Sequence, residues 1–477
     1  MNVLFVVSEC APVVKVGGLG DVAGALPAAL RRRGHDVRVV MPRYRAAKRL
    51  PAERLDDPLG VPTGAGTLWS AVWQAQLAGG VPLYLIEHDA LFDRDGIYGN
   101  GRGEYGDNLL RFAMLSRAAI ELCPIVDFGP DLFHVHDWQS ALVPFMLRTL
   151  DPSGVGRAAT VLTVHNQGYQ GLFPLDQYPL LGFGPEHLRP ATIEHFGALN
   201  LLKAGLVSAT RLTAVSARYA AEIQTPLGGA GLDGVMRARA ADLTGILNGI
   251  DDVTWNPATD PLLPANYDVD DLSGKAVCKE ALQRELGLPL RADVPLVGLV
   301  SRFAEQKGID VFADALGYLL DEDLQFAVLG SGEPWAEAHF GRLSHLTQRF
   351  RARIGYDEGL AHRIEAGADL FVMPSRYEPC GLNQMYSQRY GTMPIVRAVG
   401  GLKDTVEHEL TGFTFAELSG KALAETIALA AETYREGPEQ FRAMQRLSMR
   451  KNMGWDRSAS QYDALYRLAI AQHSGRL

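Results

Sequence analysis

The feature that most constrains the fold is an alternation of short apolar, β-branched runs with segments of helical periodicity. Residues 3–7 and 37–40 are two such runs. Between them Val22, Leu26 and Leu30 recur every four residues, as on one face of a helix. Strands separated by helices are typical of parallel sheets covered by helices on both faces. The sequence therefore predicts an α/β fold built from doubly wound parallel sheets.

Further apolar runs predict the strands of two separate sheets. In the first half they lie at residues 83–86, 132–135, 160–164 and 212–215. In the second half they lie at residues 296–300, 326–329, 370–372 and 395–396. Residues 247–275 separate the two series, are rich in Asp, Asn and Pro, and have no sustained period, which indicates a long connector.

This organisation predicts two domains and a separate C-terminal helix. The first domain is expected over residues 1–245 and the second over residues 246–455, with residues 246–275 as its connector. The segment 456–477 contains Tyr462, Leu465 and Tyr466 at near-helical spacing. Because doubly wound sheets bind ligands at the carboxyl ends of their strands, a binding cleft between the domains is expected.

The glycine-rich segment "KVGGLGDVAGALP", residues 15–27, matches the letters of the G-x-G-x-x-G/A dinucleotide pattern from Gly18 to Ala23. That pattern requires the strand to end directly before the loop, whereas about ten residues separate the run 3–7 from Gly18. No acidic residue closes the second strand about twenty residues later, where a ribose would be bound. The segment therefore favours a different anion-binding loop over a nicotinamide site.

A similar segment, "GGLKDTV" at residues 400–406, occurs in the second half. One interpretation is a pair of glycine loops, one in each domain, that present backbone N–H groups to anionic oxygens. The other interpretation is two unrelated tight turns.

Composition and charge exclude several classes of protein. The net charge of −9 argues against nucleic acid as the main partner, since phosphate contacts need a basic face. The four cysteines show no C-x-x-C spacing, so neither a disulfide framework nor a cysteine zinc site is indicated. No apolar stretch has the length of a membrane span, and the N-terminal run is too short for a secretory segment. A soluble cytoplasmic protein is expected.

Charged residues follow two of the predicted strands in the second half. Arg302 and Lys307 come after the run 296–300 and have the charge and geometry that suit a diphosphate, although a solvated turn is the alternative. Glu378 follows the run 370–372 near an expected helix start. Its carboxylate would either accept hydrogen bonds from sugar hydroxyls or cap that helix.

Histidines stand at the strand ends of the first half. His165 ends the run 160–164, where it would reach a bound sugar or serve a structural role. His134 and His136 share one strand face and Asp137 follows, but no third His or Cys lies nearby in sequence, so a metal site is disfavoured.

Other motifs with known chemistry are weak or absent. The Asp-x-Asp triplets at residues 93–95 and 268–270 resemble the metal-nucleotide motif of some sugar transferases but are interpreted as ordinary loops. No P-loop and no G-x-S-x-G elbow occurs.

Several longer segments carry a family resemblance: "SECAPVVKVGGLGDVAGALP", "HVHDWQSALVP", "LTVHNQGYQG", "LNGIDDVTWNPATDP", "VSRFAEQKGID", "IGYDEGLAH", "PSRYEPCGLNQ" and "VGGLKDTV". In these segments the chain resembles the bacterial glycogen synthase and plant starch synthase family over nearly its whole length. The resemblance implies a GT-B fold, in which two Rossmann-like domains face each other across a cleft and a C-terminal helix crosses back to the first domain.

The resemblance also implies roles for particular residues. On the second domain, Arg302 and Lys307 would hold the donor diphosphate, Tyr356 would stack on the adenine, and glucose hydroxyls would be held by Glu378 with the backbone of Gly381 and Leu382.

On the first domain, the resemblance implies that Lys15 and Gly18 contact the donor's phosphate and glucosyl region. His165 and Asn248 would address the sugar, and Asp137 would lie on the same side of the cleft. Ser208-Ala209-Thr210 departs from the family's usual Tyr-Ala-Asp.

The implied reaction is transfer of glucose from ADP-glucose to the nonreducing end of an α-1,4-glucan such as glycogen, with retention at the anomeric carbon. No carboxylate pair stands out as nucleophile and acid, so we expect the leaving phosphate to help deprotonate the acceptor, with cations stabilising the charge. No metal, cofactor, nucleic acid or membrane partner is expected. The first strand begins almost at residue 1, which favours the bacterial enzyme over a plastid one.

Two other functions are compared with this one. A phosphorylase-like enzyme of the same fold is disfavoured, because that class needs a pyridoxal-phosphate lysine and a far longer chain. A noncatalytic glucan- or nucleotide-binding protein is the main alternative. Tyr356 would stack on either base, so no residue of the sequence sets a preference for ADP-glucose over UDP-glucose. The sequence does not define an oligomeric state.

Overall fold

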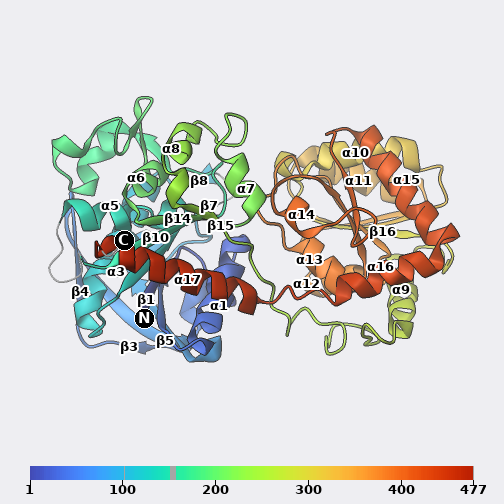
Figure 1. Cartoon of the computed structure of the whole chain (residues 1–477), viewed down its shortest axis with the longest axis horizontal. Coiled ribbons are helices and arrows are strands. Elements are labelled where there is room, and N and C mark those ends of the chain that lie inside the picture. The colour runs from blue at the N-terminus through green and yellow to red at the C-terminus, as the bar shows by residue number, and fades with distance from the viewer. Residues whose placement is uncertain (101–102, 151–156, 476–477) are drawn as a thin grey trace. The chain divides into compact units, whose positions relative to one another are not determined.

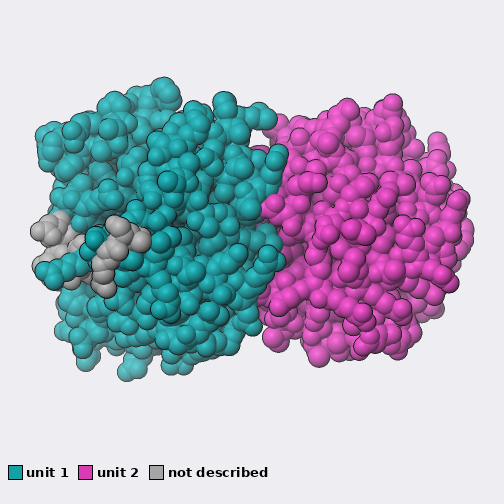
Figure 2. Space-filling view, in the orientation of Figure 1, with its two compact units in different colours: residues 1–249, 455–477 teal, residues 250–454 magenta. Residues whose placement is uncertain are grey.

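The chain folds into two compact units in a computed structural model, which describes residues 1–100, 103–150 and 157–475. Unit 1 comprises Met1–Gly249 together with Trp455–Leu477, and unit 2 comprises Ile250–Gly454 (Figure 2). The unit boundaries thus lie after residues 249 and 454, where the sequence predicted them after residues 245 and 455. No helix of the described residues is long and apolar enough to cross a membrane.

Unit 1 is built on one large sheet with the order β15-β14-β10-β9-β1-β2-β6-β5-β3, in which β4 pairs with β5. All neighbours from β15 to β6 are parallel, whereas β5 runs antiparallel to β6, β4 and β3. The strands are β1 (Asn2–Val6), β2 (Asp36–Pro42), β3 (Glu53–Arg54), β4 (Leu59–Thr63), β5 (Gly66–Leu77), β6 (Val81–Glu87), β9 (Leu132–His136), β10 (Ala159–Val164), β14 (Arg211–Ala214) and β15 (Leu243–Gly245).

The chain order reverses at β1, because β2 and β6 lie on one side of it and β9 and β10 on the other. Such a reversal opens a crevice beyond the carboxyl ends of the two central strands, which is where doubly wound sheets bind ligands. The ends of β1 and β9 are therefore the expected site of unit 1.

Helices and smaller strands complete unit 1 (Figure 1). The helices are α1 (Gly18–Arg32), α2 (Asp89–Phe92), α3 (Asn108–Ile125), α4 (Asp137–Ser140), α5 (Leu142–Thr149), α6 (Leu201–Ser208), α7 (Ala217–Glu222), α8 (Asp233–Ala238) and α17 (Trp455–His473). The strands are the antiparallel pair β7 (Gly99–Asn100) and β8 (Gly103–Glu104), and the antiparallel β11 (Leu172–Pro174), β12 (Glu194–His195) and β13 (Ala198–Asn200).

The last helix, α17, packs onto unit 1 and is drawn in red across it in Figure 1. Its buried side chains recur every three to four residues, which gives it one apolar face. The Tyr466 hydroxyl lies 2.7 Å from Nδ1 of the buried His134 of β9. On the side of α1, Asp463 pairs with Arg33 and with His35. The predicted crossing of the C-terminal helix back to the first domain is confirmed.

Unit 2 contains a parallel sheet with the order β18-β17-β16-β19-β20-β21. Its chain order reverses between β16 and β19, so the carboxyl ends of these two strands form a second switch point. The strands are β16 (Leu296–Val300), β17 (Gln325–Gly330), β18 (Phe350–Ile354), β19 (Leu370–Met373), β20 (Met393–Arg397) and β21 (Phe413–Phe415).

Alternate residues of these strands enter two different cores. Phe326 and Val328 of β17 belong to one cluster, which includes Phe312, while Ala327 and Leu329 belong to another. Because successive strand side chains point to opposite faces, both faces of the sheet are buried under helices. The helices are α9 (Ser273–Leu286), α10 (Ile309–Leu319), α11 (Pro334–Leu346), α12 (Glu358–Gly367), α13 (Asn383–Arg389), α14 (Gly400–Thr405), α15 (Gly420–Glu436) and α16 (Pro438–Met449).

The connector at the start of unit 2 has no helix or strand before α9 but is firmly anchored. The indole of Trp255 stacks between the rings of His362 and Tyr386, with centroid distances of 3.8 Å on both sides. Asp260 is buried and accepts a hydrogen bond from the Tyr390 hydroxyl at 2.6 Å, and its carboxylate lies 2.7 Å from Nδ1 of His362. Ring stacking and buried hydrogen bonds therefore hold this segment in place, although it forms no helix or strand.

Candidate functional site

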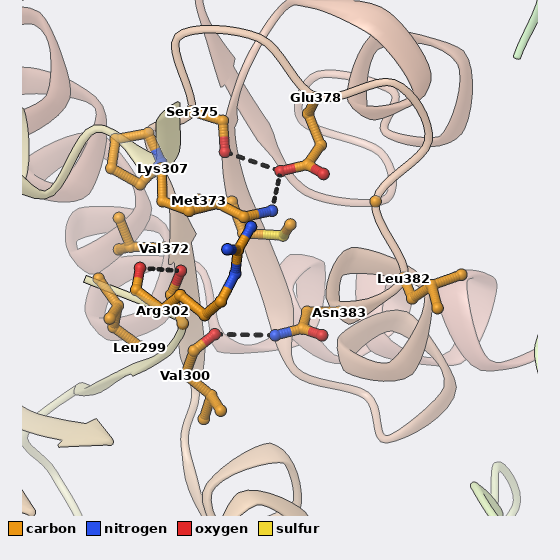
Figure 3. Close-up of a pocket in the computed structure, with 13 residues that line it drawn as sticks. Leu299, Val300, Arg302, Lys307, Val372, Met373, Ser375, Glu378, Leu382 and Asn383 are labelled. Atoms are coloured by element: carbon orange, nitrogen blue, oxygen red, sulfur yellow. Dashed lines mark hydrogen bonds and ion pairs between the residues drawn. The ribbon is translucent and has the colours of Figure 1, made fainter. Parts of the chain in front are cut away.

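A pocket of about 190 Å³ opens at the switch point of unit 2 (Figure 3). Its walls come from the end of β16, the turn before α10, the end of β19 and the segment before α13, which are far apart in sequence. The lining residues are Leu299, Val300, Ser301, Arg302, Lys307, Val372, Met373, Pro374, Ser375, Glu378, Gly381, Leu382 and Asn383. The structure thus brings together all the candidates of unit 2 except Tyr356.

Glu378 is the central acceptor of this pocket. Its side chain is only 7% exposed, and its Oε2 accepts hydrogen bonds from Lys307 Nζ at 2.6 Å and from Ser375 Oγ at 3.0 Å (Figure 3). The N-cap of α13 is Leu382, without a side-chain cap hydrogen bond. Of the two roles left open by the sequence, helix capping by Glu378 is therefore wrong. Its Oε1 has no protein partner among the described residues and remains available to a ligand.

Arg302 supplies the second cation of the pocket. Within the described part of the chain, its guanidinium makes no hydrogen bond or ion pair with another side chain or carbonyl. Since Lys307 is balanced by Glu378, Arg302 leaves the pocket with an unbalanced positive charge. A planar guanidinium beside an ammonium suits a diphosphate.

The second glycine segment serves close packing in unit 2. The N–H of Gly401 donates to the carbonyls of Glu378 and Pro379, so this amide is not presented to an anion. A Cβ at Gly400 would lie 1.9 Å from the Glu378 carbonyl oxygen, and one at Gly401 would lie 2.1 Å from that of Cys380. These glycines let α14 approach the segment that carries Glu378.

Tyr356 lies just after β18 and outside the pocket lining. Its side chain is 87% exposed, and the following Asp357 caps α12 by accepting a hydrogen bond from the N–H of Leu360 at 2.8 Å. An exposed ring held next to a capped helix is a suitable stacking surface for a flat base.

The glycine loop of unit 1, residues 15–20, lies between β1 and the body of α1. Lys15 pairs with Asp21 at 2.6 Å, and a Cβ on Gly20 would lie 3.0 Å from Cγ of Lys15. A Cβ on Gly18 would meet no atom within 4 Å, so Gly18 borders open space at the first turn of the helix. The start of a long helix attracts negative charge, which agrees with the predicted anion-binding role.

Glu9 holds this loop in place and was missed by the sequence analysis. Its buried carboxylate accepts hydrogen bonds from the N–H of Val16 and, at 3.1 Å, from the N–H of Gly17. Burial raises the pKa of Glu9, while these hydrogen bonds act in the opposite direction. The available signal was an acidic side chain three residues beyond an apolar strand.

Asp137 and His165 meet at the ends of the neighbouring strands β9 and β10. Oδ1 of Asp137 accepts hydrogen bonds from the N–H of His165 at 2.6 Å and of Asn166 at 3.3 Å. Asp137 has a φ of +51°, and burial raises its pKa to about 7. Strained backbone and a buried carboxylate both cost free energy, and such costs cluster at functional sites.

His165 is a neutral imidazole in this environment. Burial lowers its pKa to about 3, and its Nε2 lies 3.0 Å from Nδ1 of His136. The sequence showed no third histidine close to His134 and His136, but in the structure His165 lies next to His136. Even so, no group of three or more His, Cys, Asp or Glu side chains within residues 1–100, 103–150 and 157–475 is arranged to hold a metal ion.

Asn248 is the last candidate of unit 1 and follows β15. Its side chain is buried, and its Oδ1 has no hydrogen-bond partner within the described residues. A buried acceptor without a partner costs free energy unless a ligand or water satisfies it. This observation agrees with the predicted sugar-binding role.

Comparisons with known proteins cover the whole chain. Residues 2–238 match the family model described as starch synthase catalytic domain, and residues 286–446 match glycosyl transferases group 1. The glycogen synthase of Anaeromyxobacter sp. (strain Fw109-5) is 52% identical over 99% of this chain and 100% of its own. The chain belongs to the glycogen and starch synthase family. Glycogen synthase 1 of Geobacter sulfurreducens is 49% identical over 100% of this chain and 97% of its own.

Solved structures confirm the GT-B fold and the family. The catalytic domain of Starch Synthase IV from Arabidopsis thaliana, bound to ADP and acarbose, superimposes with a TM-score of 0.91 at 33% identity over 98% of this chain and 99% of its own. Sucrose-phosphate synthase from Thermosynechococcus elongatus, at 20% identity and a TM-score of 0.62, supports the fold alone. As a member of the glycogen and starch synthase family, the protein is a glycosyltransferase.

Proposed function

We propose that the protein is a glycogen synthase that transfers glucose from ADP-glucose to the nonreducing end of an α-1,4-glucan, with retention at the anomeric carbon. The observation that carries the proposal is the pocket of unit 2, where the unbalanced Arg302 lies next to the Lys307–Glu378 pair. ADP-glucose and glycogen are its proposed partners, in the cytoplasm. Family membership and the similarity to a starch synthase bound to ADP support these partners.

The donor diphosphate is assigned to the two cations of unit 2. As the bond between the anomeric carbon and the diphosphate breaks, negative charge develops on the leaving oxygen, and Arg302 and Lys307 stabilise that charge. The free Oε1 of Glu378 accepts hydrogen bonds from glucose hydroxyls, with the backbone of Gly381 and Leu382 lining the same pocket. Tyr356 stacks on the adenine.

Unit 1 contributes a lysine, a glycine and two neutral polar side chains in this proposal. Lys15 and Gly18 contact the donor's phosphate and glucosyl region, while His165 and Asn248 hydrogen-bond the sugar. With a pKa of about 3, His165 acts as a neutral hydrogen-bonding group and is not a proton donor of the imidazolium type. Asp137 fixes the backbone N–H of His165 and thereby the position of its ring.

The proposed transfer uses no protein nucleophile. The acceptor's 4-hydroxyl oxygen forms a bond to the anomeric carbon on the face from which the diphosphate departs, and the hydroxyl proton passes to the departing phosphate oxygen. Retention follows because attack and departure share one face. Neither a metal nor a cofactor is assigned a role in this mechanism.

The test is release of ADP and UDP from ADP-glucose and UDP-glucose, measured with and without glycogen and in the presence of EDTA. Glycogen-dependent release of ADP, with growth of the glucan, supports the proposal. Release that is independent of glycogen indicates hydrolysis instead. Binding of glycogen or ADP without any release supports the noncatalytic alternative.

A further inference from the structure

Glu9 joins two segments that are distant in sequence. Its Oε2 accepts hydrogen bonds from the N–H groups of Val16 and Gly17, the two residues directly before α1. Its Oε1 accepts a hydrogen bond from the Tyr98 hydroxyl at 3.2 Å, across a separation of 89 residues. The same hydroxyl lies 2.8 Å from Oγ of Ser8. The orientation of the Glu9 carboxylate is therefore set from both sides.

Helix α3 fixes the position of Tyr98. Asn108 donates from Nδ2 to the Tyr98 carbonyl at 2.9 Å. Arg111, which is fully buried, donates to the carbonyls of Leu91 at 2.7 Å and Ile97 at 2.8 Å. The segment that carries Tyr98 is thus attached to a long, buried helix, and its hydroxyl is a rigid reference point for Glu9.

The carboxylate of Glu9 and the Lys15 side chain both lie near Gly20. A Cβ on Gly20 would lie 3.0 Å from Cγ of Lys15 and 3.4 Å from Oε2 of Glu9, so the Lys15 stem and this carboxylate lie close to the same point of the first helical turn. A change in the orientation of Glu9 would move the amides of Val16 and Gly17, and the chain on both sides of them.

The amides of Val16 and Gly17 lie before the first helical residue, Gly18. An N-cap side chain bonds the amides of the second and third helical residues, so it would not satisfy these two. Glu9 instead buries a carboxylate, which is costly, and needs a third hydrogen bond from Tyr98. Such a free-energy cost is expected where the geometry of a loop matters for binding.

We propose that Glu9 and Tyr98 are positioning residues for the sugar-nucleotide donor. The Tyr98 hydroxyl orients the carboxylate of Glu9, and that carboxylate holds the amides before α1 so that Lys15 and Gly18 meet the donor in the required geometry. This inference rests on the proposed function, in which Lys15 and Gly18 contact the donor.

The test compares Tyr98→Phe, Glu9→Ala, Glu9→Gln and the double variant Tyr98→Phe/Glu9→Ala. We measure KM for ADP-glucose, KM for glycogen, kcat and the midpoint of thermal unfolding. Loss of one hydrogen bond to a charged group predicts a KM for ADP-glucose that is roughly tenfold higher in Tyr98→Phe, with KM for glycogen nearly unchanged. Glu9→Ala raises the same KM further, and Glu9→Gln, which keeps an oxygen for the two amides, restores most of the loss.

The double variant is expected to resemble Glu9→Ala alone, because Tyr98 acts only through Glu9. Tyr105→Phe is the matched control, since the Tyr105 hydroxyl donates to the Asp95 carbonyl in a neighbouring turn and does not contact Glu9. Its KM for ADP-glucose should stay within about twofold of wild type, as for a change outside the donor site.

Three outcomes overturn the inference: an unchanged KM for ADP-glucose in Tyr98→Phe, an equal rise in Tyr105→Phe, or full additivity in the double variant. If Glu9→Ala does not fold, Tyr98→Phe and Tyr105→Phe still decide the first two outcomes. Wild-type protein without glycogen-dependent ADP release would instead refute the proposed function itself. The two failures are therefore distinguishable.

Discussion

Replacing Arg302 and Lys307 separately by alanine should separate catalysis from stability within one pocket. Both side chains line the pocket of unit 2, but their surroundings differ. Arg302→Ala removes a guanidinium that has no partner among the described residues, so no buried polar atom is left unsatisfied. Lys307→Ala leaves the carboxylate of Glu378, 7% exposed, with only the Ser375 hydroxyl as a donor.

The expected magnitudes follow from this difference. Arg302→Ala should change the free energy of unfolding by less than about 0.5 kcal/mol, as for a surface substitution without lost partners. Lys307→Ala should lower it by about 2 kcal/mol, because a buried acceptor loses its cation. For a unit of this size that corresponds to a fall of roughly 4–8 °C in the midpoint of thermal unfolding. Both variants should lose about 10²–10³-fold in kcat, since each cation stabilises the leaving group.

Scanning calorimetry and turnover at saturating ADP-glucose and glycogen provide the assay. Arg446→Ala is the control, because Arg446 is an exposed arginine of α16 outside the pocket lining. Equal losses of thermal stability in the Arg302 and Lys307 variants would refute the argument from the ion pair. Full turnover in either variant would refute the assigned catalytic role.

Three further predictions concern other residues. Because burial raises the pKa of Asp137 to about 7, its ionisation opposes folding above that pH, and stability rises as pH falls through 7 towards the ordinary carboxylate range. Asp137→Asn should therefore raise the unfolding midpoint at pH 8 and raise it less at pH 5, and a difference independent of pH would contradict this. Tyr356→Ala, at an 87% exposed side chain, should raise KM for ADP-glucose about tenfold. Its unfolding midpoint should not change, and a lower one would indicate a structural role. Trp255→Ala removes a ring stacked on both faces and should lower the free energy of unfolding by about 3 kcal/mol in urea titrations. Trp69→Ala, at a 66% exposed indole, should have little effect.

The central strands could be predicted from sequence because they are buried on both faces. The expected strands 296–300 and 160–164 correspond to β16 (Leu296–Val300) and β10 (Ala159–Val164), both continuous apolar or β-branched runs. The edge strand β18 was missed, since its residues include Arg351 and Arg353, which face partly or fully to solvent. The long strand β5 was also missed, because buried, half-buried and exposed residues are mixed along it and no long apolar run marks it.

The candidate site was predictable where it lies at the end of a strand. Arg302, Glu378 and His165 follow apolar runs, and parallel strands of one sheet bring their carboxyl ends to one edge. The contact between Glu9 and Tyr98 was not predictable, because it depends on how a loop 89 residues away packs on α3. The close packing of Gly400 and Gly401 was not predictable either, since Gly-Gly-Leu stands at a helix start in both units but makes close backbone contacts only in unit 2.

The division of unit 1 between the two ends of the chain has a consequence for the order of synthesis. On the ribosome, the chain leaves unit 1 at Gly249 and re-enters it only at Trp455. At translation rates of about 5–20 residues per second, helix α17 appears roughly 10–40 s after the rest of unit 1. During that interval His134 lacks the Tyr466 hydroxyl that it contacts in the finished fold. The domain made first is thus the one completed last, and until then the surface that the buried face of α17 covers stays exposed.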